Sequence, residues 1–402
     1  MLIIMNPLQP QNLASGAIAS IANLSNTLGI TESELKAVTK IPLSARYKKI
    51  TIKKSNGDDR TVFDPCLQLR KIQRRINTRI FKKIVKWPSY LYGSIPNDKV
   101  PDDDHTDDEF HRDYVSCAKK HCRSKSILKL DITDFFENIH RELVSQLFKD
   151  FFHFDSEVVS FLTEVCCYDQ RVVQGALTSS YIATLCFWDV EHKIVQKLQR
   201  RDLVYTRLVD DITISSKFKG YDFSNAESHV KNMLLEKDFP LNTEKRKVMR
   251  VGSGPFQVHG LIVDFSTPRL PPTEISKIKA SVYNLVKSAS VNNYRTTLTF
   301  RDQYFRCLGR VNRLARVNHN KHAPLLMKLK CIKPMPGNVD VEKVKNSIDL
   351  LRRAKDNSTA LYRRLYYISR YRIALIARSF RHEADALLFD FNKLKKPLKT
   401  ID

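Results

Sequence analysis

Alternating hydrophobic and polar positions predict a β-hairpin near the start of the chain. Residues 47–54 and 60–63 alternate on either side of Asn56-Gly57, a dipeptide that favours a tight turn, and both arms carry cations. Residues 11–40 have small apolar residues at helical spacing and a Thr31-Glu-Ser-Glu34 capping signal, so we expect helices there. Beyond the hairpin, a basic amphipathic helix is predicted over 67–87, with one apolar face formed by Leu69, Ile72, Ile76, Ile80 and Ile84.

The centre of the chain alternates between strand and helix patterns. Ser126-Ile-Leu-Lys-Leu-Asp-Ile132 is typical of a buried strand that ends in a carboxylate. Two short β-rich runs, 203–208 and 212–216, flank Val209-Asp210-Asp211 and predict a hairpin with two acids at its tip. The other elements expected here are helices over 141–167 and 177–200 and strands over 245–250 and 256–263.

After Pro271-Pro272 the pattern is helical to the end, with loops near 318–323 and 333–338. Residues 305–316 predict a basic amphipathic helix, and 341–392 predict one or two long helices in which arginines alternate with tyrosines. Arginines can bind phosphates and aromatic rings can stack on bases, so this pattern suits the binding of a structured RNA or of a single strand. A packed bundle with a solvated face is the alternative, and each description can hold for a different face. The candidate RNA- and DNA-binding residues are Arg306, Arg310, Arg313, Arg363, Arg364 and Arg370.

The net charge points to polyanionic partners. The 402 residues include 68 Lys and Arg against 43 Asp and Glu, a formal charge of +25, and 28 of these bases lie in residues 271–402. The opposite pole is an acidic run over 102–109, expected to form a solvated surface insertion at about 100–112. No apolar run reaches the roughly 18 residues of a membrane span, and the N-terminus lacks the basic region of a secretory signal, so we expect no membrane and a cytoplasmic protein.

The spacing of the eight cysteines is irregular and includes no Cys-x-x-Cys motif. This pattern suggests reduced thiols in a cytoplasm. A zinc site is the alternative for one stretch, although its spacing matches no familiar zinc pattern: His111, Cys117, His121 and Cys122.

Three acids are candidates for chemistry. Asp131 follows a strand, and Asp210 and Asp211 stand at a hairpin tip. Carboxylates at adjacent strand ends can converge on two divalent cations, which activate a 3′-hydroxyl and stabilise leaving pyrophosphate in an in-line transfer. Each acid alone could be an ordinary cap or turn residue. The segments around the acids favour the metal site.

These segments resemble the motifs of bacterial reverse transcriptases. Leu130-Asp-Ile-Thr-Asp-Phe-Phe136 is similar to their first palm motif, Gln174-Gly-Ala-Leu-Thr-Ser-Ser180 to their Gln-Gly motif, and Tyr205-Thr-Arg-Leu-Val-Asp-Asp-Ile-Thr-Ile-Ser215 to their catalytic hairpin. Leu241-Asn-Thr-Glu-Lys245 and Val258-His-Gly-Leu-Ile-Val263 follow in the family's order. The resemblance covers roughly residues 47–318 and is specific as a set.

Within that group, the chain resembles retron and other defence-associated (antiphage) reverse transcriptases. Cys117-Ala-Lys-Lys-His121 is similar to the retron Asn-Ala-x-x-His element, with Cys117 in place of Asn. Val258-His259-Gly260 is similar to Val-Thr-Gly, with His259 in place of Thr. The catalytic hairpin departs too, with Leu208-Val209 where Tyr-Ala is usual, yet all three acids are present. We therefore expect an active, divergent enzyme.

The resemblance implies roles for single residues. Asp131, Asp210 and Asp211 are the expected catalytic residues, and they would hold two Mg²⁺ ions, with Mn²⁺ as an alternative, together with the backbone carbonyl of Ile132. Phe136 is the expected ring against the sugar, where it would exclude a 2′-hydroxyl, whereas Phe135 is expected in the core.

Other residues are expected to bind the deoxynucleoside triphosphate. The cations of the hairpin could clamp its phosphates, although a solvated hairpin edge would look the same. Gln174 and Gly175 suggest a close backbone approach to nucleotide and template. Lys245 could protonate or neutralise pyrophosphate, and a surface lysine without such a role is the alternative. The hairpin residues in this set are Lys53, Lys54 and Arg60.

The sequence thus predicts an α+β right-hand polymerase fold with a helical C-terminal extension. We expect N-terminal helices and fingers over 1–125, a palm over 126–270, a thumb over 271–335 and a basic extension over 336–402. The predicted function is RNA-directed DNA synthesis on a noncoding RNA in antiphage defence. The alternatives are template-independent or protein-primed synthesis, and an RNA-binding scaffold or toxin subunit that needs no polymerase activity. A homo-oligomer or a partner protein stays open.

Overall fold

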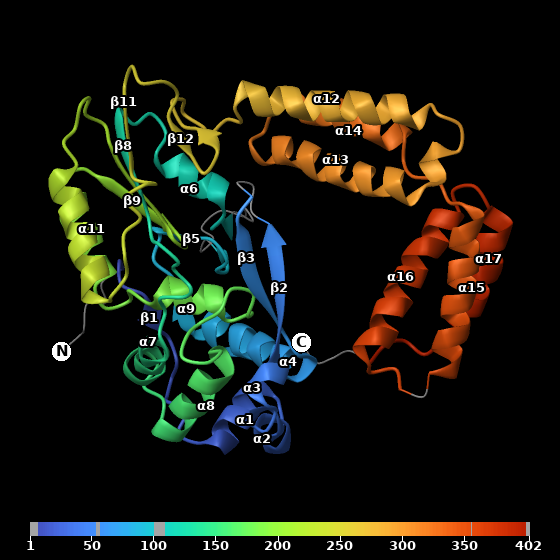
Figure 1. Ribbon diagram of the computed structural model, residues 1–402, viewed down its shortest axis with the longest axis horizontal. Helices are drawn as coiled ribbons and strands as arrows, with labels where there is room; N and C mark the ends of the chain where they lie inside the picture. Colours follow the sequence, from blue (N-terminus) through green and yellow to red (C-terminus); the bar gives the residue numbers. More distant parts are fainter. Residues whose placement is uncertain (1–6, 54–56, 100–108, 355, 399–402) are drawn as a thin grey trace. The chain divides into compact units, whose positions relative to one another are not determined.

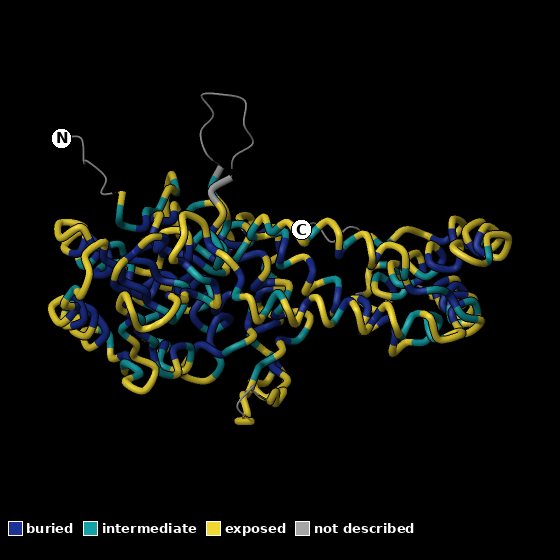
Figure 2. Tube along the Cα trace, turned by 90° about the horizontal axis from the view of Figure 1, so that it is seen from above, coloured by how far each residue is buried: buried dark blue, intermediate teal, exposed yellow. Residues whose placement is uncertain are grey.

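The computed structural model describes residues 7–53, 57–99, 109–354 and 356–398. The chain divides into two compact units, Met1–Pro268 and Arg269–Asp402. The expected mixture of helices and strands is present, and within the described residues every strand lies in the first unit. Buried positions gather inside each unit, with exposed ones over its surface (Figure 2). Lys54 and the acidic run over 102–108 lie outside the described residues.

A mixed sheet forms the centre of the first unit (Figure 1). Among the described residues it has five strands in the order β11-β8-β10-β9-β5, antiparallel except for the β5–β9 pair. The predicted strand over 126–132 and the predicted hairpin over 203–216 are its three middle strands. The bounds are β5 Leu91–Tyr92, β8 Ser126–Asp131, β9 Val204–Leu208, β10 Asp211–Ser216 and β11 Lys247–Arg250.

Side-chain alternation gives this sheet two different faces. One face is mainly apolar and joins the main core through residues such as Leu130 and Ile214. Helices α10 (Glu191–Gln199) and α11 (Ser224–Glu236) contribute Val195 and Val230 to the same core. The other face places Asp131 opposite Asp211 in the β8–β10 register, so the two acids share one side of the sheet.

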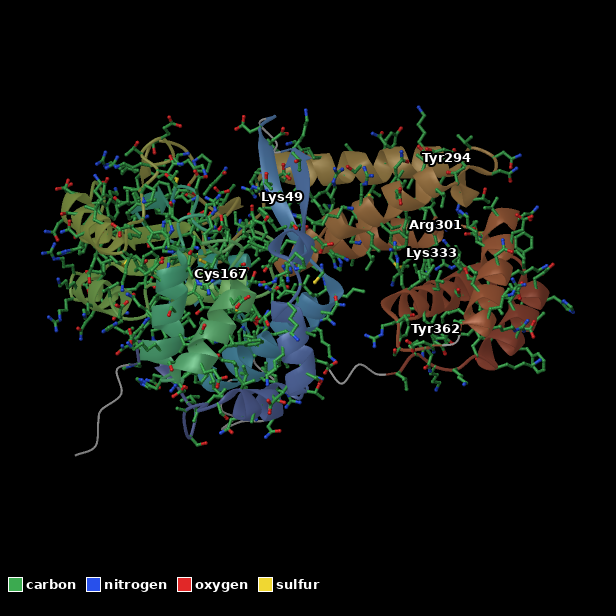
Figure 3. The ribbon with its side chains drawn as sticks, turned by 60° about the horizontal axis from the view of Figure 1, so that its bottom comes forward. Lys49, Cys167, Tyr294, Arg301, Lys333 and Tyr362 are labelled. Carbon is green, nitrogen blue, oxygen red and sulfur yellow. The ribbon has the colours of Figure 1, made fainter. Side chains whose placement is uncertain are left out.

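The predicted hairpin consists of β2 (Tyr47–Lys53) and β3 (Asp59–Pro65), joined across seven residue pairs from Tyr47↔Pro65 to Lys53↔Asp59. Most of its positions are exposed, and Figure 3 labels Lys49 on it. Its base packs on the core through Tyr47, whose ring meets Phe63 edge-on at 6.3 Å. The hairpin is therefore a projecting arm with an anchored root.

The prediction of helix throughout residues 11–40 was partly wrong. The helices are α1 (Ile21–Leu28) and α2 (Glu32–Thr39), and the capping box between Thr31 and Glu34 is confirmed. Residues 11–12 instead form β1 (Gln11–Asn12), which pairs with β4 (Val85–Lys86). This pairing also explains why the helix predicted over 67–87 ends early, as α4 (Leu67–Ile76), a π-helical turn (Asn77–Phe81) and α5 (Lys82–Ile84).

Two other long helices predicted from periodicity are interrupted. Residues 141–167 form α7 (Arg141–Gln146), a π-helical turn (Leu147–Phe151) and α8 (Ser156–Cys166), and His153 between them has a φ of 57°. Residues 177–200 form α9 (Ser179–Leu185) and α10. Apolar spacing continues across both breaks because each fragment buries its face in the same core, so periodicity did not reveal them.

The strand predicted over 256–263 is a tight hairpin instead. Strands β12 (Gln257–Val258) and β13 (Leu261–Ile262) pair around His259 and Gly260, whose φ values are 49° and 77°. Positive φ at both central positions is the geometry of a turn whose twist suits a two-residue hairpin. The remaining elements of this unit are α3 Leu43–Arg46, β6 Asp98–Lys99, β7 Glu109–Phe110 and α6 Tyr114–Lys120.

The second unit is helical in its described residues. The loops predicted near 318–323 and 333–338 separate helices, but 341–392 contains parts of three helices where one or two were predicted. Arg301, labelled in Figure 3, donates to both carboxylate oxygens of Asp340 at 3.0 and 2.9 Å and so ties α13 to α15. The helices are α12 Pro272–Ala289, the 3-10 turn Tyr294–Thr296, α13 Leu298–Arg316, α14 His322–Cys331, α15 Asn338–Arg353, α16 Ala360–Ile376 and α17 Arg381–Asn392.

All eight cysteines lie within the described residues, and each is a free thiol. Within the same residues, none of the helices has the length and apolar character needed to cross a membrane.

Candidate active site

Three carboxylates meet at one end of the central sheet. Asp131 ends β8, Asp211 begins β10, and the two are cross-strand partners. The Ile132 amide donates to the Asp210 carbonyl at 3.2 Å, which joins the end of β8 to the hairpin tip. Val209, just before the acids, has a φ of 60°, a strained conformation for a β-branched residue. Its carbonyl accepts a hydrogen bond from the buried Arg207 side chain at 3.0 Å, which helps to hold the tip.

The Asp131 carboxylate is held by the predicted Leu241–Lys245 motif. Lys245 Nζ lies 2.8 Å from Asp131 Oδ2, and the Asn242 amide donates to the Asp131 carbonyl at 2.8 Å. The Asn242 side chain in turn accepts from the Lys245 amide at 3.2 Å. The hydrogen bond to Asp131 raises the pKa of Lys245, so this lysine stays charged. The Lys245 side chain is thus paired with Asp131 while 64% of its surface stays exposed.

The Asp211 carboxylate has two different partners. Lys129 Nζ lies 3.4 Å from Asp211 Oδ2, and His259 Nδ1 lies 3.3 Å from the same oxygen. Burial raises the pKa of Asp211, but the hydrogen bond from His259 and the charge of Lys129 outweigh it, so the pKa is lowered. Asp211 is therefore a carboxylate at neutral pH.

Asp210 differs from its neighbour. Burial raises the pKa of Asp210, and the charges of Asp131 and Asp211 raise it further. A backbone hydrogen bond and the charge of Lys245 lower it, but the net result is a raised pKa. The three carboxylates are thus close enough to repel one another. A cation bound among them would relieve this repulsion.

A buried polar network joins α6 and His121, the residue that follows it, to strands β9 and β10. His121 Nδ1 lies 2.7 Å from Ser215 Oγ and His121 Nε2 lies 2.7 Å from Thr206 Oγ1, so this side chain bridges β9 and β10. Burial lowers the pKa of His121 to about 3, which keeps the ring neutral. Cys117 Sγ lies 3.3 Å from Thr206 Oγ1 and 3.2 Å from His259 Nε2. Helix α6 therefore braces the catalytic hairpin from its polar face.

Hard oxygen donors are the ligands that Mg²⁺ prefers, and the mutually repelling acids fit a divalent cation. In the described part of the chain, no group of three or more His, Cys, Asp and Glu side chains is already arranged around one point. Lysines instead partly neutralise two of the acids. The expected zinc alternative gains no support from geometry, because His111 lies 3.2 Å from Asn97 Nδ2 while His121 and Cys117 take part in the α6 network.

Comparisons with known proteins place the chain in a family. The family model "Reverse transcriptase (RNA-dependent DNA polymerase)" matches residues 52–299. The chain is 43% identical to the retron Ec48 reverse transcriptase of Escherichia coli, over 93% of this chain and 92% of that protein. This chain belongs to the retron reverse transcriptases.

A second relative of this reverse transcriptase is the retron Se72 reverse transcriptase of Salmonella heidelberg, 32% identical over 82% of this chain and 83% of the relative. A solved structure of apo telomerase from Candida tropicalis is 10% identical, with a TM-score of 0.40, and the match covers 87% of this chain and 65% of that one. Family membership confirms the predicted right-hand polymerase fold and makes the enzyme an RNA-dependent DNA polymerase. Divalent metal ions are the general cofactors of this family.

The residues expected to bind the nucleotide differ in their exposure. Lys53 and Arg60 are exposed, and the charge of Arg60 makes a small contribution that lowers the pKa of Lys245. Phe136 is half-buried beside Phe135, and Phe135 lies in the core, where it stacks on Phe187 with centroids 6.0 Å apart.

Gly175 has a structural requirement that the sequence did not reveal. Its φ is 107°, and a Cβ built there would lie 2.4 Å from the Phe63 carbonyl oxygen of β3. The neighbouring Gln174 carbonyl accepts from the Phe63 amide at 2.8 Å. The Gln-Gly motif therefore touches the hairpin backbone itself, and nucleotide contact by these residues stays a prediction.

The expected nucleic-acid arginines of the second unit are in different situations. Arg306, Arg364 and Arg370 are exposed. On α13, Arg310 donates to Ser281 at 2.9 Å and Arg313 to Glu274 at 3.3 Å, so these two side chains also join α13 to α12. On α16, Arg363 donates to the Leu398 carbonyl at 2.9 Å.

Sequence reasoning missed two features of the site in the first unit. Lys129 lies two residues before Asp131 on the same strand, so alternation alone could have placed it on the acidic face. The fully buried Arg207 pairs with Glu191 at 2.6 Å, and Tyr205 donates to the same carboxylate at 2.7 Å. Glu191 comes from α10, so no local pattern predicted that pair.

Proposed function

We propose that this reverse transcriptase copies a dedicated noncoding RNA into DNA, and that this synthesis serves antiphage defence in the cytoplasm. Support comes from the retron reverse transcriptases that resemble it over most of their length. The observation that carries the catalytic part is the cross-strand pairing of Asp131 with Asp211 beside Asp210.

The proposed metal ligands are the carboxylates of Asp131, Asp210 and Asp211 and the backbone carbonyl of Ile132. The raised pKa of Asp210 supports this, because burial is its largest cause and the charges of Asp131 and Asp211 add to it. Two Mg²⁺ ions, or Mn²⁺ as an alternative, would supply the activation of the primer 3′-hydroxyl and the stabilisation of pyrophosphate.

Several residues would bind the deoxynucleoside triphosphate. Lys245 keeps its charge beside Asp131 and would neutralise or protonate the pyrophosphate as it leaves. Lys53 and Arg60, with Lys54 of the same hairpin, would hold the phosphates. Phe136 would exclude the 2′-hydroxyl of ribonucleotides, while Gln174 and Gly175 would set the position of the hairpin against the palm.

The remaining assignments concern the subdomains of the right-hand polymerase fold. We propose fingers within 1–125, a palm over 126–270, a thumb over 271–335 and a basic extension over 336–402. Template RNA and product DNA would contact the arginines of the helical unit. Exposure of Arg306, Arg364 and Arg370 supports this, because these side chains are open to a phosphate backbone.

Primer extension tests the proposal. Purified protein with Mg²⁺ and deoxynucleotides should extend a primer on an RNA template, and the double variant Asp210→Asn with Asp211→Asn should not. Product without any template would indicate template-independent or protein-primed synthesis. If the double variant keeps both DNA synthesis and phage protection, the polymerase site is wrongly assigned. If it loses DNA synthesis but keeps phage protection, a scaffold or toxin role that needs no polymerase activity replaces the proposal. Sequencing the RNA and DNA that copurify with the protein identifies the template.

A further inference from the structure

The two positions at which this chain departs from the retron elements lie in contact with each other. Cys117 is on α6 and His259 is in the β12–β13 turn, 142 residues apart in sequence, yet Cys117 Sγ lies 3.2 Å from His259 Nε2. Both side chains are nearly closed to solvent: Cys117 is fully buried, and the His259 side chain is 5% exposed. The two departures therefore share one packed site.

This pair reaches the acids directly. The other ring nitrogen of His259, Nδ1, lies 3.3 Å from Asp211 Oδ2. An ionised carboxylate only accepts hydrogen bonds, so Nδ1 is the donor to Asp211, while Nε2 faces Cys117 Sγ, which also lies 3.3 Å from Thr206 Oγ1. Burial raises the pKa of Cys117 to about 12, so that thiol keeps its proton at neutral pH.

Compared with the retron elements, this chain has a shorter side chain at position 117 and a longer one at position 259. The retron elements Asn-Ala-x-x-His and Val-Thr-Gly, which these segments resemble, have Asn and Thr at the positions of Cys117 and His259. Here the shorter Cys117 is on the helix and the longer His259 is in the turn. Because the site is close-packed, either residue changed alone gives an overpacked or underfilled contact.

We propose that Cys117 and His259 are a compensating pair that positions the Asp211 carboxylate for nucleotidyl transfer. His259 is a positioning residue: it contacts Asp211 and is itself held by Cys117. The inference rests on the role proposed for Asp211. A hydrogen-bonding partner that fixes a ligand carboxylate commonly governs both metal affinity and activity.

A double-mutant cycle tests the pair. His259→Thr and Cys117→Asn should each lower kcat by about 10-fold to 100-fold, the usual loss when a partner of a ligand is removed. KM for the deoxynucleotide should stay within about twofold, because Asp211 acts on the reacting groups. The double variant, which restores the retron residues, should recover to within about threefold of the natural protein. Cys122→Asn combined with His259→Thr is the matched control, because Cys122 is also buried beside α6 but contacts Ala118, and it should give no rescue.

A second readout does not depend on activity. The unfolding temperature of the metal-free protein, measured over the same four variants, should fall in each single variant and return in the double variant. Additive losses in both measurements would overturn the pairing. Recovery of stability without recovery of kcat would limit the pair to packing and overturn the positioning role. If the natural protein makes no DNA, the proposed function fails, while the stability cycle still reports the contact.

Discussion

The ammonium group of Lys245 lies 2.8 Å from the carboxylate of Asp131, across 114 residues of sequence. This pair holds the positive charge of the Lys245 side chain at the end of the central sheet in the absence of any ligand. We predict that Lys245→Ala lowers the rate of single-nucleotide incorporation by about 10-fold to 100-fold, since a positive group is lost where pyrophosphate would leave. Lys245→Arg should retain part of the rate. Lys197→Ala, at an exposed position of α10, is the control and should change the rate little.

Asp210 is predicted to limit the stability of the metal-free protein. Its pKa is raised by burial and by the charges of Asp131 and Asp211, so the ionised side chain opposes folding at neutral pH. Asp210→Asn removes that charge and should raise the free energy of unfolding by about 0.5–2 kcal/mol while abolishing DNA synthesis. Urea unfolding without metal, alongside primer extension, measures both effects. A less stable, active variant would contradict this assignment.

Gly175 should tolerate no side chain. Gly175→Ala places a Cβ 2.4 Å from the Phe63 carbonyl oxygen at a φ of 107°, so it should cost more than about 2 kcal/mol of stability and weaken synthesis by displacing the hairpin. Gly252 is the matched control, because its φ is 97° but nothing lies within 4 Å of the position that a Cβ would take there. Gly252→Ala therefore reports the backbone strain alone. Equal losses in both variants would exclude the clash.

His121 makes the stability depend on pH. Its pKa in the folded protein is about 3, below the 6.5 of the free side chain, because burial disfavours the charged ring. The unfolded chain therefore binds a proton first, and stability is complete above pH 6.5 and falls as the pH drops towards 3. The expected slope is up to about 1.4 kcal/mol per pH unit. His121→Asn should remove this component in urea titrations between pH 5 and 7.5. An unchanged slope would show that the neutral, buried histidine is not its source.

Substitutions of two arginines of α13 should have different effects, one mainly on RNA binding and the other also on helix packing. Arg306→Ala should weaken RNA binding and lower the slope of log affinity against log salt by about 1. Arg313→Ala should also loosen α12 from α13, because Arg313 contacts Glu274, although an exposed pair contributes only about 0–1 kcal/mol. Binding titrations at several salt concentrations, with thermal unfolding of both variants, measure the two contributions. An unchanged salt slope in Arg306→Ala would remove it from the RNA interface.

Local patterns predicted the parts of the fold that local forces decide. The β2–β3 hairpin followed from alternation around Asn-Gly, and the capping box at Thr31 followed from residue spacing. Periodicity failed where a distant segment intervened. Residues 85–86 leave the predicted helix because β1 offers a pairing partner, and 256–263 turns back at His259 and Gly260.

The sequence by itself determined the family, the order of the motifs and the three acids, because each of these is written in short contiguous segments. Only the tertiary structure decided what each acid contacts. Lys129, Lys245 and His259 reach Asp131 and Asp211 through contacts between separate elements, and Cys117 reaches His259 across 142 residues. Such contacts depend on how distant elements pack, and residue spacing along the chain carries no record of that packing. The departures at Cys117 and His259, which look unrelated in sequence, are for this reason a single site in the folded protein.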